Sequence, residues 1–271
     1  MYILIDIGGT KTRIAAARTQ DDFGEPDVFK TPQDFSSWIA SVHKSTETLR
    51  NDKELRGIIV GVPGTFTKDG VVIKTPNLPH WQGIPLKEHL EKLFDVEVIV
   101  YNDTALVGLG EAVYGAGKNH EIVTYLTIST GVNGVRIVDG KIDRNTNGFE
   151  IGHSIIDVEH EKDVESIISG GALERKFGKP SHEVQDALVW EKISRYAGVF
   201  SANTAMYWSP SIIIIGGPVM NDLHIDIIEK EAKRHLYMYK EHPLFARGVL
   251  KDFGGLYGAL VISKGLANNS Q

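Results

Sequence analysis

The sequence predicts an α/β fold in which helices cover the faces of the β-sheets. Short apolar runs rich in valine and isoleucine, typical of buried strands, alternate along the chain with longer segments of helical spacing. Two pairs of these strands enclose turns that contain glycine and small hydroxyl residues. The 271 residues suit one large domain or two smaller lobes around a cleft.

The expected strands stop at or near glycine, proline, asparagine or aspartate, which favour turns. They cover residues 2–7, 12–17, 57–62, 96–100, 122–129, 134–138 and 211–215. Helices are expected between and after the strands, where the apolar pattern has a helical period. They cover residues 35–49, 86–93, 104–114, 164–177, 184–207, 223–235 and 256–266.

The composition excludes several classes of function. Lys and Arg total 29 and Asp and Glu total 35, so the net charge of −6 gives no electrostatic reason to expect a nucleic-acid partner. The absence of cysteine excludes disulfides, thiolate nucleophiles and zinc sites built from cysteine. Residues 1–17 contain Asp6 and Lys11 and no basic leader, and the apolar run 212–215 is too short to cross a bilayer. We therefore expect a cytoplasmic protein without a membrane partner.

The two strand pairs with glycine turns resemble each other. At an offset of 123 positions, Tyr2, Ile5, Gly8, Arg13 and Ile14 coincide with identical residues. Identities over so short a window are compatible with chance. A chain of two related halves, each opening with a turn of phosphate-binding size, would give the same pattern.

The turn after the first strand carries the strongest local signal, Asp6-Ile7-Gly8-Gly9-Thr10-Lys11. Glycine lets backbone N–H groups approach phosphate oxygens closely, while Thr10 adds a hydroxyl and Lys11 a cation. Asp6 is placed to hold magnesium through water. A hairpin turn that merely needs glycine explains these residues as well, and the spacing is not that of a P-loop.

A second turn of this kind, Ser129-Thr130-Gly131, lies between two further strands. Its hydroxyls and its glycine suit another phosphate contact. They suit a plain β-turn equally well, so the segment alone leaves both alternatives open.

Asn102 and Asp103 follow a buried strand and precede a helix. A carboxylate at the carboxyl end of a strand in an α/β protein points toward the ligand crevice, where it can accept the proton of an attacking hydroxyl. The alternative is that Asp103 caps the helix, and spacing alone favours that alternative.

Two more segments carry chemically suggestive residues. Glu150 and His153 lie three positions apart after a polar loop, a spacing that suits either a diol or a metal ion. Asp252-Phe253-Gly254 has the letters of a protein-kinase motif, but the other segments of that motif set are missing from the sequence. We interpret this tripeptide as coincidence.

Together these segments resemble the ROK family of sugar kinases, within the hexokinase and actin-like superfamily, almost from end to end. Each is weak by itself, and their common order makes the match specific. The segments are Asp6-Ile7-Gly8-Gly9-Thr10-Lys11, Gly61-Val62-Pro63-Gly64 with Thr75-Pro76-Asn77-Leu78-Pro79-His80-Trp81, Asn102-Asp103 with Gly110-Glu111, Ser129-Thr130-Gly131, Glu150-Ile151-Gly152-His153, Ile215-Gly216-Gly217-Pro218, and Gly255 with Gly258-Ala259.

The resemblance implies a fold of two actin-like (ribonuclease H-like) lobes with an active-site cleft between them. The smaller lobe would comprise residues 1–108, completed by the C-terminal helix 254–271, and the larger lobe residues 109–253. Asp6 and Ser129 would then face each other across the cleft. A homodimer is the expected assembly.

The resemblance also implies a kinase that transfers the γ-phosphoryl group of ATP to a hexose hydroxyl, with Mg²⁺ and without zinc. Asp103 would be the general base. Glucose is the first expected substrate, and N-acetylmannosamine, N-acetylglucosamine, fructose and allose are alternatives. The residues expected to bind sugar are Gly64, Thr75, Asn77, Asn102, Asp103, Glu150, His153 and Glu165. Those expected to bind the nucleotide are Asp6, Gly8, Gly9, Thr10, Lys11, Ser129, Thr130, Gly131, Gly216 and Gly217.

Two departures from the family pattern bear on the expected metal and phosphoryl donor. The family's cysteine-rich zinc loop is missing after His153, which therefore lacks its partner ligands, and Glu165 matches the final glutamate of that loop. The second turn is poorer in glycine than usual, which leaves polyphosphate open as a donor.

Two alternatives of another class follow from these departures and from the family itself. A sugar-responsive regulator would need a DNA-binding module, and the chain begins directly at the first phosphate strand. A non-catalytic sugar or nucleotide binder would fit the weakened second turn, whereas the retention of Asp6 and Asp103 argues against it.

Overall fold

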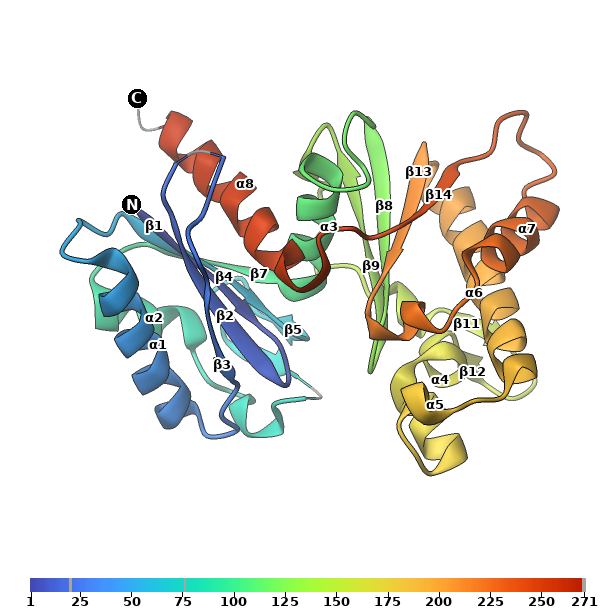
Figure 1. Ribbon diagram of the computed structural model, residues 1–271, viewed down its shortest axis with the longest axis horizontal. Coiled ribbons are helices and arrows are strands. Elements are labelled where there is room, and N and C mark those ends of the chain that lie inside the picture. Colours follow the sequence, from blue (N-terminus) through green and yellow to red (C-terminus); the bar gives the residue numbers. More distant parts are fainter. Residues whose placement is uncertain (20, 76, 270–271) are drawn as a thin grey trace. The chain divides into compact units, whose positions relative to one another are not determined.

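The computed structural model describes residues 1–19, 21–75 and 77–269, and it is an α/β protein as the sequence predicts (Figure 1). The chain forms two compact units, Met1–Gly110 with Asp252–Gln271 as the first and Glu111–Lys251 as the second. Each unit contains a five-stranded sheet with helices packed against it. Of the helices described, none combines the length and the apolar character needed to cross a bilayer.

The sheet of the first unit has the order β3-β2-β1-β4-β7. β1 is antiparallel to β2 and parallel to β4, which is in turn parallel to β7. Because three neighbouring strands run in one direction, their carboxyl ends lie at one edge of the sheet, where α/β proteins bind ligands. The strands are β1 (Tyr2–Ile7), β2 (Lys11–Ala17), β3 (Asp27–Lys30), β4 (Gly57–Val62) and β7 (Val98–Asn102).

The alternation of side chains along β1 decides what each face of this sheet carries. Ile3, Ile5 and Ile7 are buried in a core that includes Trp38. Asp6 points to the opposite face, on which the C-terminal helix α8 packs. The helices of this unit are α1 (Phe35–Arg50), α2 (Leu86–Phe94), α3 (Asp103–Val113) and α8 (Gly254–Asn269).

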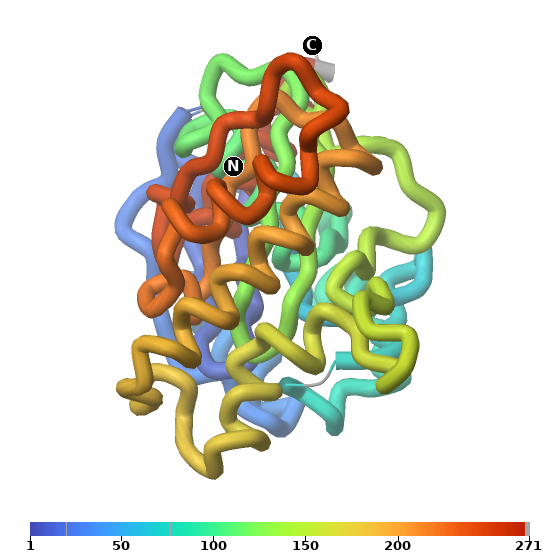
Figure 2. The backbone as a smooth tube through the Cα atoms, turned by 90° about the vertical axis from the view of Figure 1, so that its right-hand side faces the viewer, coloured from blue at the N-terminus to red at the C-terminus, as the bar shows by residue number. Residues whose placement is uncertain are grey.

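The sheet of the second unit has the order β10-β9-β8-β13-β14. Helices α6 and α7 pack side by side in this unit (Figure 2), with Gly198 of α6 directly against Glu231 of α7. The strands are β8 (Ile122–Ile128), β9 (Val132–Val138), β10 (Lys141–Ile142), β13 (Ile212–Gly216) and β14 (Leu244–Arg247). The helices are α4 (Glu165–Ile168), α5 (Gly170–Phe177), α6 (Ala187–Trp208) and α7 (Ile225–His235).

The two sheets repeat one topology. In each, the central strand pairs with an antiparallel hairpin partner on one side and with a parallel strand on the other. Asp6 pairs with Gly61 on β4, Thr127 pairs with Gly216 on β13, and each glycine stands two residues before a proline. The structural counterpart of Asp6 is therefore Thr127 and not Ser129, the residue at the offset of 123. Only the first unit carries a carboxyl group at this position.

One expected helix is wrong. Residues 164–177 form two helices, α4 and α5, because Ser169 between them is extended (φ −70°, ψ 153°). The Ser169 hydroxyl accepts a hydrogen bond from the N–H of Ala172 at 3.0 Å and so caps α5. The N–H groups of Gly170 and Gly171 bond to carbonyls of the second glycine turn instead of continuing α4.

The other expected strands and helices are present with ends shifted by a few residues. The sequence did not predict the short or edge strands, which are too brief or too charged to show an apolar pattern. These are β3, β10, β14, β5 (Thr65–Phe66), β6 (Val72–Lys74), β11 (Ile155–Asp157) and β12 (Lys162–Asp163). Short 3-10 turns occur at Pro79–Trp81, Ile151–His153, Ser181–Glu183, Pro218–Asn221 and Lys251–Phe253.

Candidate functional site

The first glycine turn is held by its own backbone and by Thr31. The N–H of Gly8 donates to the carbonyl of Lys11 at 2.9 Å. Thr31, which follows β3, donates from its hydroxyl to the carbonyl of Gly8 at 2.7 Å and from its N–H to the carbonyl of Thr10 at 2.9 Å. Thr10 and Lys11 are exposed. The turn is thus fixed from one side while its polar side chains reach solvent.

Asp6 lies at the end of β1 and is only 7% exposed. Its Oδ2 is 3.6 Å from Nη1 of Arg13, whose Nη2 is 3.3 Å from Oδ2 of Asp252. Burial raises the pKa of Asp6 to about 7, against the effect of Arg13 and with that of the charges on Asp103 and Asp252. The carboxyl group is therefore poised between its two protonation states near neutral pH, and an added cation would favour the charged form.

Two glycines allow other chain segments to approach this carboxyl group. A Cβ on Gly255, in the first turn of α8, would lie 2.6 Å from Cγ of Asp6, closer than any side chain permits. A Cβ on Gly61 would lie 3.7 Å from Oδ1 of Asp6 and 3.5 Å from Cα of Asp103. Asp6 and Asp103 therefore flank Gly61 at the carboxyl edge of the sheet.

Asn102, and not Asp103, caps α3. The Oδ1 of Asn102 accepts a hydrogen bond from the N–H of Ala105 at 3.2 Å, and its Nδ2 donates to the carbonyl of Gly64 at 3.0 Å. Asp103 is the first residue of the helix, and its Oδ1 accepts from the N–H of Thr104 at 2.7 Å. The alternative that Asp103 serves as the N-cap is therefore wrong. Burial raises the pKa of Asp103, as suits a general base.

The remaining predicted sugar residues of the first unit, Gly64, Thr75 and Asn77, lie in the loops after β4 and β6. Gly64 has a φ of +89°, and a Cβ there would lie 2.0 Å from the carbonyl oxygen of Lys74. A Cβ on Gly9 would lie 2.5 Å from Cβ of Asn77, so the first turn contacts the expected sugar loop. The buried hydroxyl of Thr75 has no hydrogen-bond partner among the described residues.

The second glycine turn, Ser129-Thr130-Gly131, is bonded mainly to the segment that contains α4 and α5. The N–H of Ser129 donates to the carbonyl of Gly131 at 2.8 Å. The carbonyls of Ser129 and Thr130 accept from the N–H groups of Gly170 and Gly171 at 2.7 and 3.1 Å. Next to it, Gly217 has a φ of +91°, and a Cβ there would lie 2.4 Å from the carbonyl oxygen of Ile128. The predicted nucleotide residues of this unit therefore adjoin one another.

Beside this turn lie the predicted sugar residues of the second unit. His153 closes a 3-10 turn that begins after Glu150, and its Nδ1 lies 2.8 Å from Oδ2 of Asp163. The hydrogen bond with Asp163 raises the pKa of His153, and the charges of Glu165 and Glu150 act in the same direction. Burial would raise the pKa of Asp163, but the hydrogen bonds from His153 and Ser166 leave it lowered. The pair is therefore an ion pair below neutral pH.

The residues fit magnesium better than zinc. Magnesium keeps several waters and needs only one or two protein carboxylates besides phosphate oxygens, and Asp6 with its buried, cation-responsive carboxyl group meets that need. Zinc needs three or four close ligands. Nδ1 of His153 is engaged by Asp163, and the described part of the chain contains no group of three or more His, Cys, Asp or Glu residues that could hold a metal ion.

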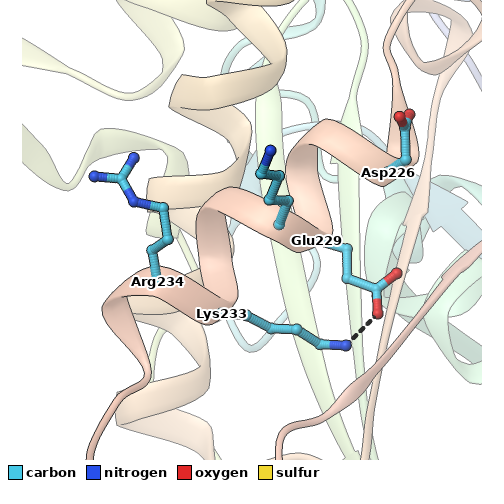
Figure 3. Close-up of a pocket in the computed structure, with 5 residues that line it drawn as sticks. Asp226, Glu229, Lys233 and Arg234 are labelled. Carbon is cyan, nitrogen blue, oxygen red and sulfur yellow. Dashed lines mark hydrogen bonds and ion pairs between the residues drawn. The ribbon is translucent and has the colours of Figure 1, made fainter.

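A separate hollow lies on the surface of α7 (Figure 3). All the residues that line it belong to this one helix, and Lys233 and Glu229 form an ion pair one turn apart. The lining residues are Asp226, Glu229, Lys230, Lys233 and Arg234. None of the predicted site residues lines it, and paired charges along one helix are typical of a solvated face.

Sequence reasoning missed four residues that hold the site together. Arg13 stands directly opposite Asp6 in the β1–β2 register, so the hairpin alone could have indicated it. The sequence shows Asp163 only as a carboxylate two residues before Glu165 and does not indicate its contact with His153. Thr31 and Asp252 left no usable signal, because one follows an unpredicted edge strand and the other lies far along the chain. Asp252, the first residue of the tripeptide that we interpreted as coincidence, contacts Arg13.

Two repeated five-stranded sheets, with a glycine turn after the first strand of each, define this chain as an actin-like α/β protein. The chain belongs to the ROK family, whose model matches residues 2–265. Two solved structures share the fold. A ROK hexokinase from Thermus thermophilus has a TM-score of 0.85 at 23% identity and covers 100% of this chain and 99% of its own. A ROK glucokinase from Streptomyces griseus, in complex with glucose and AMPPNP, has a TM-score of 0.78 at 23% identity, with 96% and 98% covered.

The chain is similar in sequence to both a kinase and a regulator. An N-acetylgalactosamine kinase from Shewanella sp. is 27% identical over 304 residues, which cover 98% of this chain and 97% of the kinase. The xylose repressor of Bacillus subtilis is 36% identical over 117 residues, which cover 42% of this chain and 30% of the repressor.

Proposed function

We propose that the protein is a sugar kinase that transfers the γ-phosphoryl group of ATP to a hydroxyl group of a hexose. The observation that carries this proposal is that Asp6 and Asp103 both lie beside Gly61 at the carboxyl edge of a parallel sheet, close enough for the charge of Asp103 to raise the pKa of Asp6. Asp6 has the surroundings of a cation ligand, and Asp103 has those of a proton acceptor. The end-to-end similarity to a kinase of N-acetylgalactosamine supports this reading.

Asp103 would accept the proton of the attacking sugar hydroxyl. Its raised pKa makes it a stronger base than an exposed aspartate, and its place in the first turn of α3 fixes its backbone. Asn102 both caps the helix and bonds to Gly64. It therefore fixes the position of the proposed base relative to the loop after β4. Such positioning supplies a large part of the rate in phosphoryl transfer.

Asp6 would hold Mg²⁺ through water, and the ion, when bound, neutralises charge on the phosphate oxygens. Arg13 lies beside the Asp6 carboxyl group and keeps part of it ionised in the absence of the metal. We assign the glycine turns after β1 and β8, with Gly216 and Gly217, to the nucleotide. We assign Gly64, Thr75, Asn77, Asn102, Glu150, His153 and Glu165 to the hydroxyl groups of the sugar.

The test is an assay of ADP formation with ATP and Mg²⁺ across a panel of hexoses. Glucose stands first, followed by N-acetylmannosamine, N-acetylglucosamine, fructose and allose, and the Shewanella relative adds N-acetylgalactosamine. We expect one sugar to give sugar phosphate and ADP in equal amounts. Polyphosphate replaces ATP in a parallel series to identify the donor. The absence of sugar phosphate from every mixture would contradict the proposal.

A sugar-responsive regulator without turnover is the second candidate, and the similarity to the xylose repressor favours it. That similarity covers less than half of this chain and less than a third of the repressor. The same panel separates the two candidates, because a sugar that raises the melting temperature without being phosphorylated indicates binding alone.

A further inference from the structure

Glu165 contacts the backbone of the second glycine turn. Its Oε2 accepts a hydrogen bond from the N–H of Val132 at 2.8 Å. A Cβ on Gly131 would lie 2.7 Å from the same oxygen, so the carboxylate rests directly against the backbone of the turn at Gly131. A residue assigned to the sugar is therefore already engaged with the turn assigned to the nucleotide.

The same segment makes further contacts with the turn. Gly170 and Gly171 donate to the carbonyls of Ser129 and Thr130, and Glu165 accepts from the residue that follows the turn. These hydrogen bonds engage two carbonyl groups of the turn and the N–H group of the residue that follows it. Since the turn has one glycine and is therefore short of the backbone freedom that phosphate turns use, outside contacts carry more of its conformation.

Glu165 is itself fixed at the start of α4. The Oδ1 of Asp163 accepts a hydrogen bond from the N–H of Ser166 in this short helix at 2.8 Å, while Oδ2 of Asp163 pairs with His153. A carboxylate held in this way can hold another segment in place. Hydrogen bonds to a charged group are also stronger than those between neutral groups.

The two possible roles of Glu165 predict opposite changes in nucleotide affinity when its carboxylate is removed. A negative charge beside a phosphate site repels the phosphate, so removing the carboxylate should strengthen nucleotide binding if Glu165 serves only the sugar. If Glu165 instead holds the turn in its binding conformation, its removal should weaken nucleotide binding.

We propose that Glu165 braces the second glycine turn and is thereby a positioning residue for the nucleotide, in addition to its assignment to the sugar. This inference rests on the proposed function, because it assigns the turn to a nucleotide. The brace is a contact within the chain, from Oε2 of Glu165 to the N–H of Val132, so its effect on the nucleotide can be measured without sugar.

The experiment titrates the full-length protein with AMPPNP and Mg²⁺ by calorimetry in the absence of sugar. Glu165→Ala removes the acceptor, and we expect affinity to fall by about tenfold or more, the equivalent of one charged hydrogen bond. Glu165→Gln keeps an acceptor oxygen for Val132 without the charge, so its affinity should equal or exceed that of the wild type. Glu174→Ala, an exposed carboxylate on α5, controls for the loss of charge from the same segment.

Amide hydrogen exchange of Val132, measured without added ligand, reports on its hydrogen bond to Glu165 independently of any activity. We expect exchange at Val132 to be about tenfold faster or more in Glu165→Ala and near the wild-type rate in Glu165→Gln. Unchanged exchange in Glu165→Ala, or AMPPNP binding as tight as that of the wild type, overturns the inference. A wild-type protein that binds no AMPPNP overturns the proposed function and the nucleotide role with it, whereas faster exchange at Val132 would still establish the brace.

Discussion

Asn102 and Asp103 make different contacts at the start of α3. Asn102 supplies the cap, so the carboxyl group of Asp103 is not needed to start α3. Asp6 lies on the other side of Gly61, buried beside Arg13. At the residue scale, a substitution of Asp103 therefore tests the proposed chemistry without removing the cap of α3.

The substitution Asp103→Asn should lower the turnover number by about 10²–10⁴-fold, the usual contribution of a general base. The melting temperature should stay near that of the wild type, because the amide oxygen can still accept from Thr104 and Asn102 still caps the helix. The turnover number with sugar in excess and the melting temperature are the two measurements. More than about a tenth of the wild-type turnover would exclude Asp103 as the base.

The pKa of Asp6 gives the folded state a specific pH dependence. A carboxyl group whose pKa rises from 3.8 in the unfolded chain to about 7 in the folded one binds its proton more tightly when folded. Its stabilising contribution is therefore complete below pH 4 and is lost as the pH rises through 7, at no more than about 1.4 kcal/mol per pH unit.

In Asp6→Asn this contribution is absent, so the variant should gain stability relative to the wild type between pH 5 and pH 8. Denaturant unfolding at the two pH values measures the difference in free energy. The variant should also lose phosphoryl transfer, since the proposed magnesium ligand is gone. A difference that stays the same from pH 5 to pH 8 would contradict this prediction and would mean that Asp6 is ionised throughout, as the neighbouring Arg13 favours.

At the scale of elements, the sequence predicted best the strands that are buried along nearly their whole length. β1, β4, β8 and β13 are apolar because they are buried in the middle of their sheets. The edge strand β3 has two charged residues among its four and shows no such pattern. Its role is nevertheless specific, because Thr31 directly after it holds the first glycine turn.

The substitution Thr31→Val tests that role with a side chain of the same shape. It keeps the N–H that bonds to Thr10 but removes the hydroxyl that donates to Gly8 and contacts Thr12. We expect a loss of about 1–3 kcal/mol in unfolding free energy and a higher KM for the nucleotide. Thr48→Val on the exposed side of α1 is the matched control and should change neither value appreciably.

At the scale of the whole molecule, the alternation of strands and helices predicted an α/β fold, and the resemblance to the ROK family predicted its two related halves. The register of that repeat could not be obtained from five scattered identities, since pairing between strands far apart in the sequence sets it. The same limit applied to the candidate site. Its residues came from local motifs, whereas their supports, Arg13, Thr31, Asp163 and Asp252, became visible only through contacts across the fold.

The loop after His153 shows how the fold holds a segment for which the family commonly uses zinc. Here β11 and β12 form a two-stranded hairpin, and Asp163 joins its end to His153 and to α4. A hydrogen-bonded pair of this kind, half exposed at the histidine, contributes on the order of 1 kcal/mol or less, far below a structural zinc site. The segment therefore depends on the neighbouring backbone bonds as well, including the one from Val164 to Ser154.

We predict that the purified protein holds no stoichiometric zinc and that its fold does not depend on zinc. Elemental analysis should find less than about a tenth of an equivalent, and EDTA should leave the melting temperature unchanged, because a structural zinc contributes folding energy that chelation removes. Added zinc should not raise the melting temperature either, as it would if a specific site existed in the folded state. His153→Ala should cost no more than the weak pair it breaks, about 1 kcal/mol. One equivalent of zinc, removed by EDTA with loss of the fold, would contradict this prediction and would restore His153 to the role of a metal ligand.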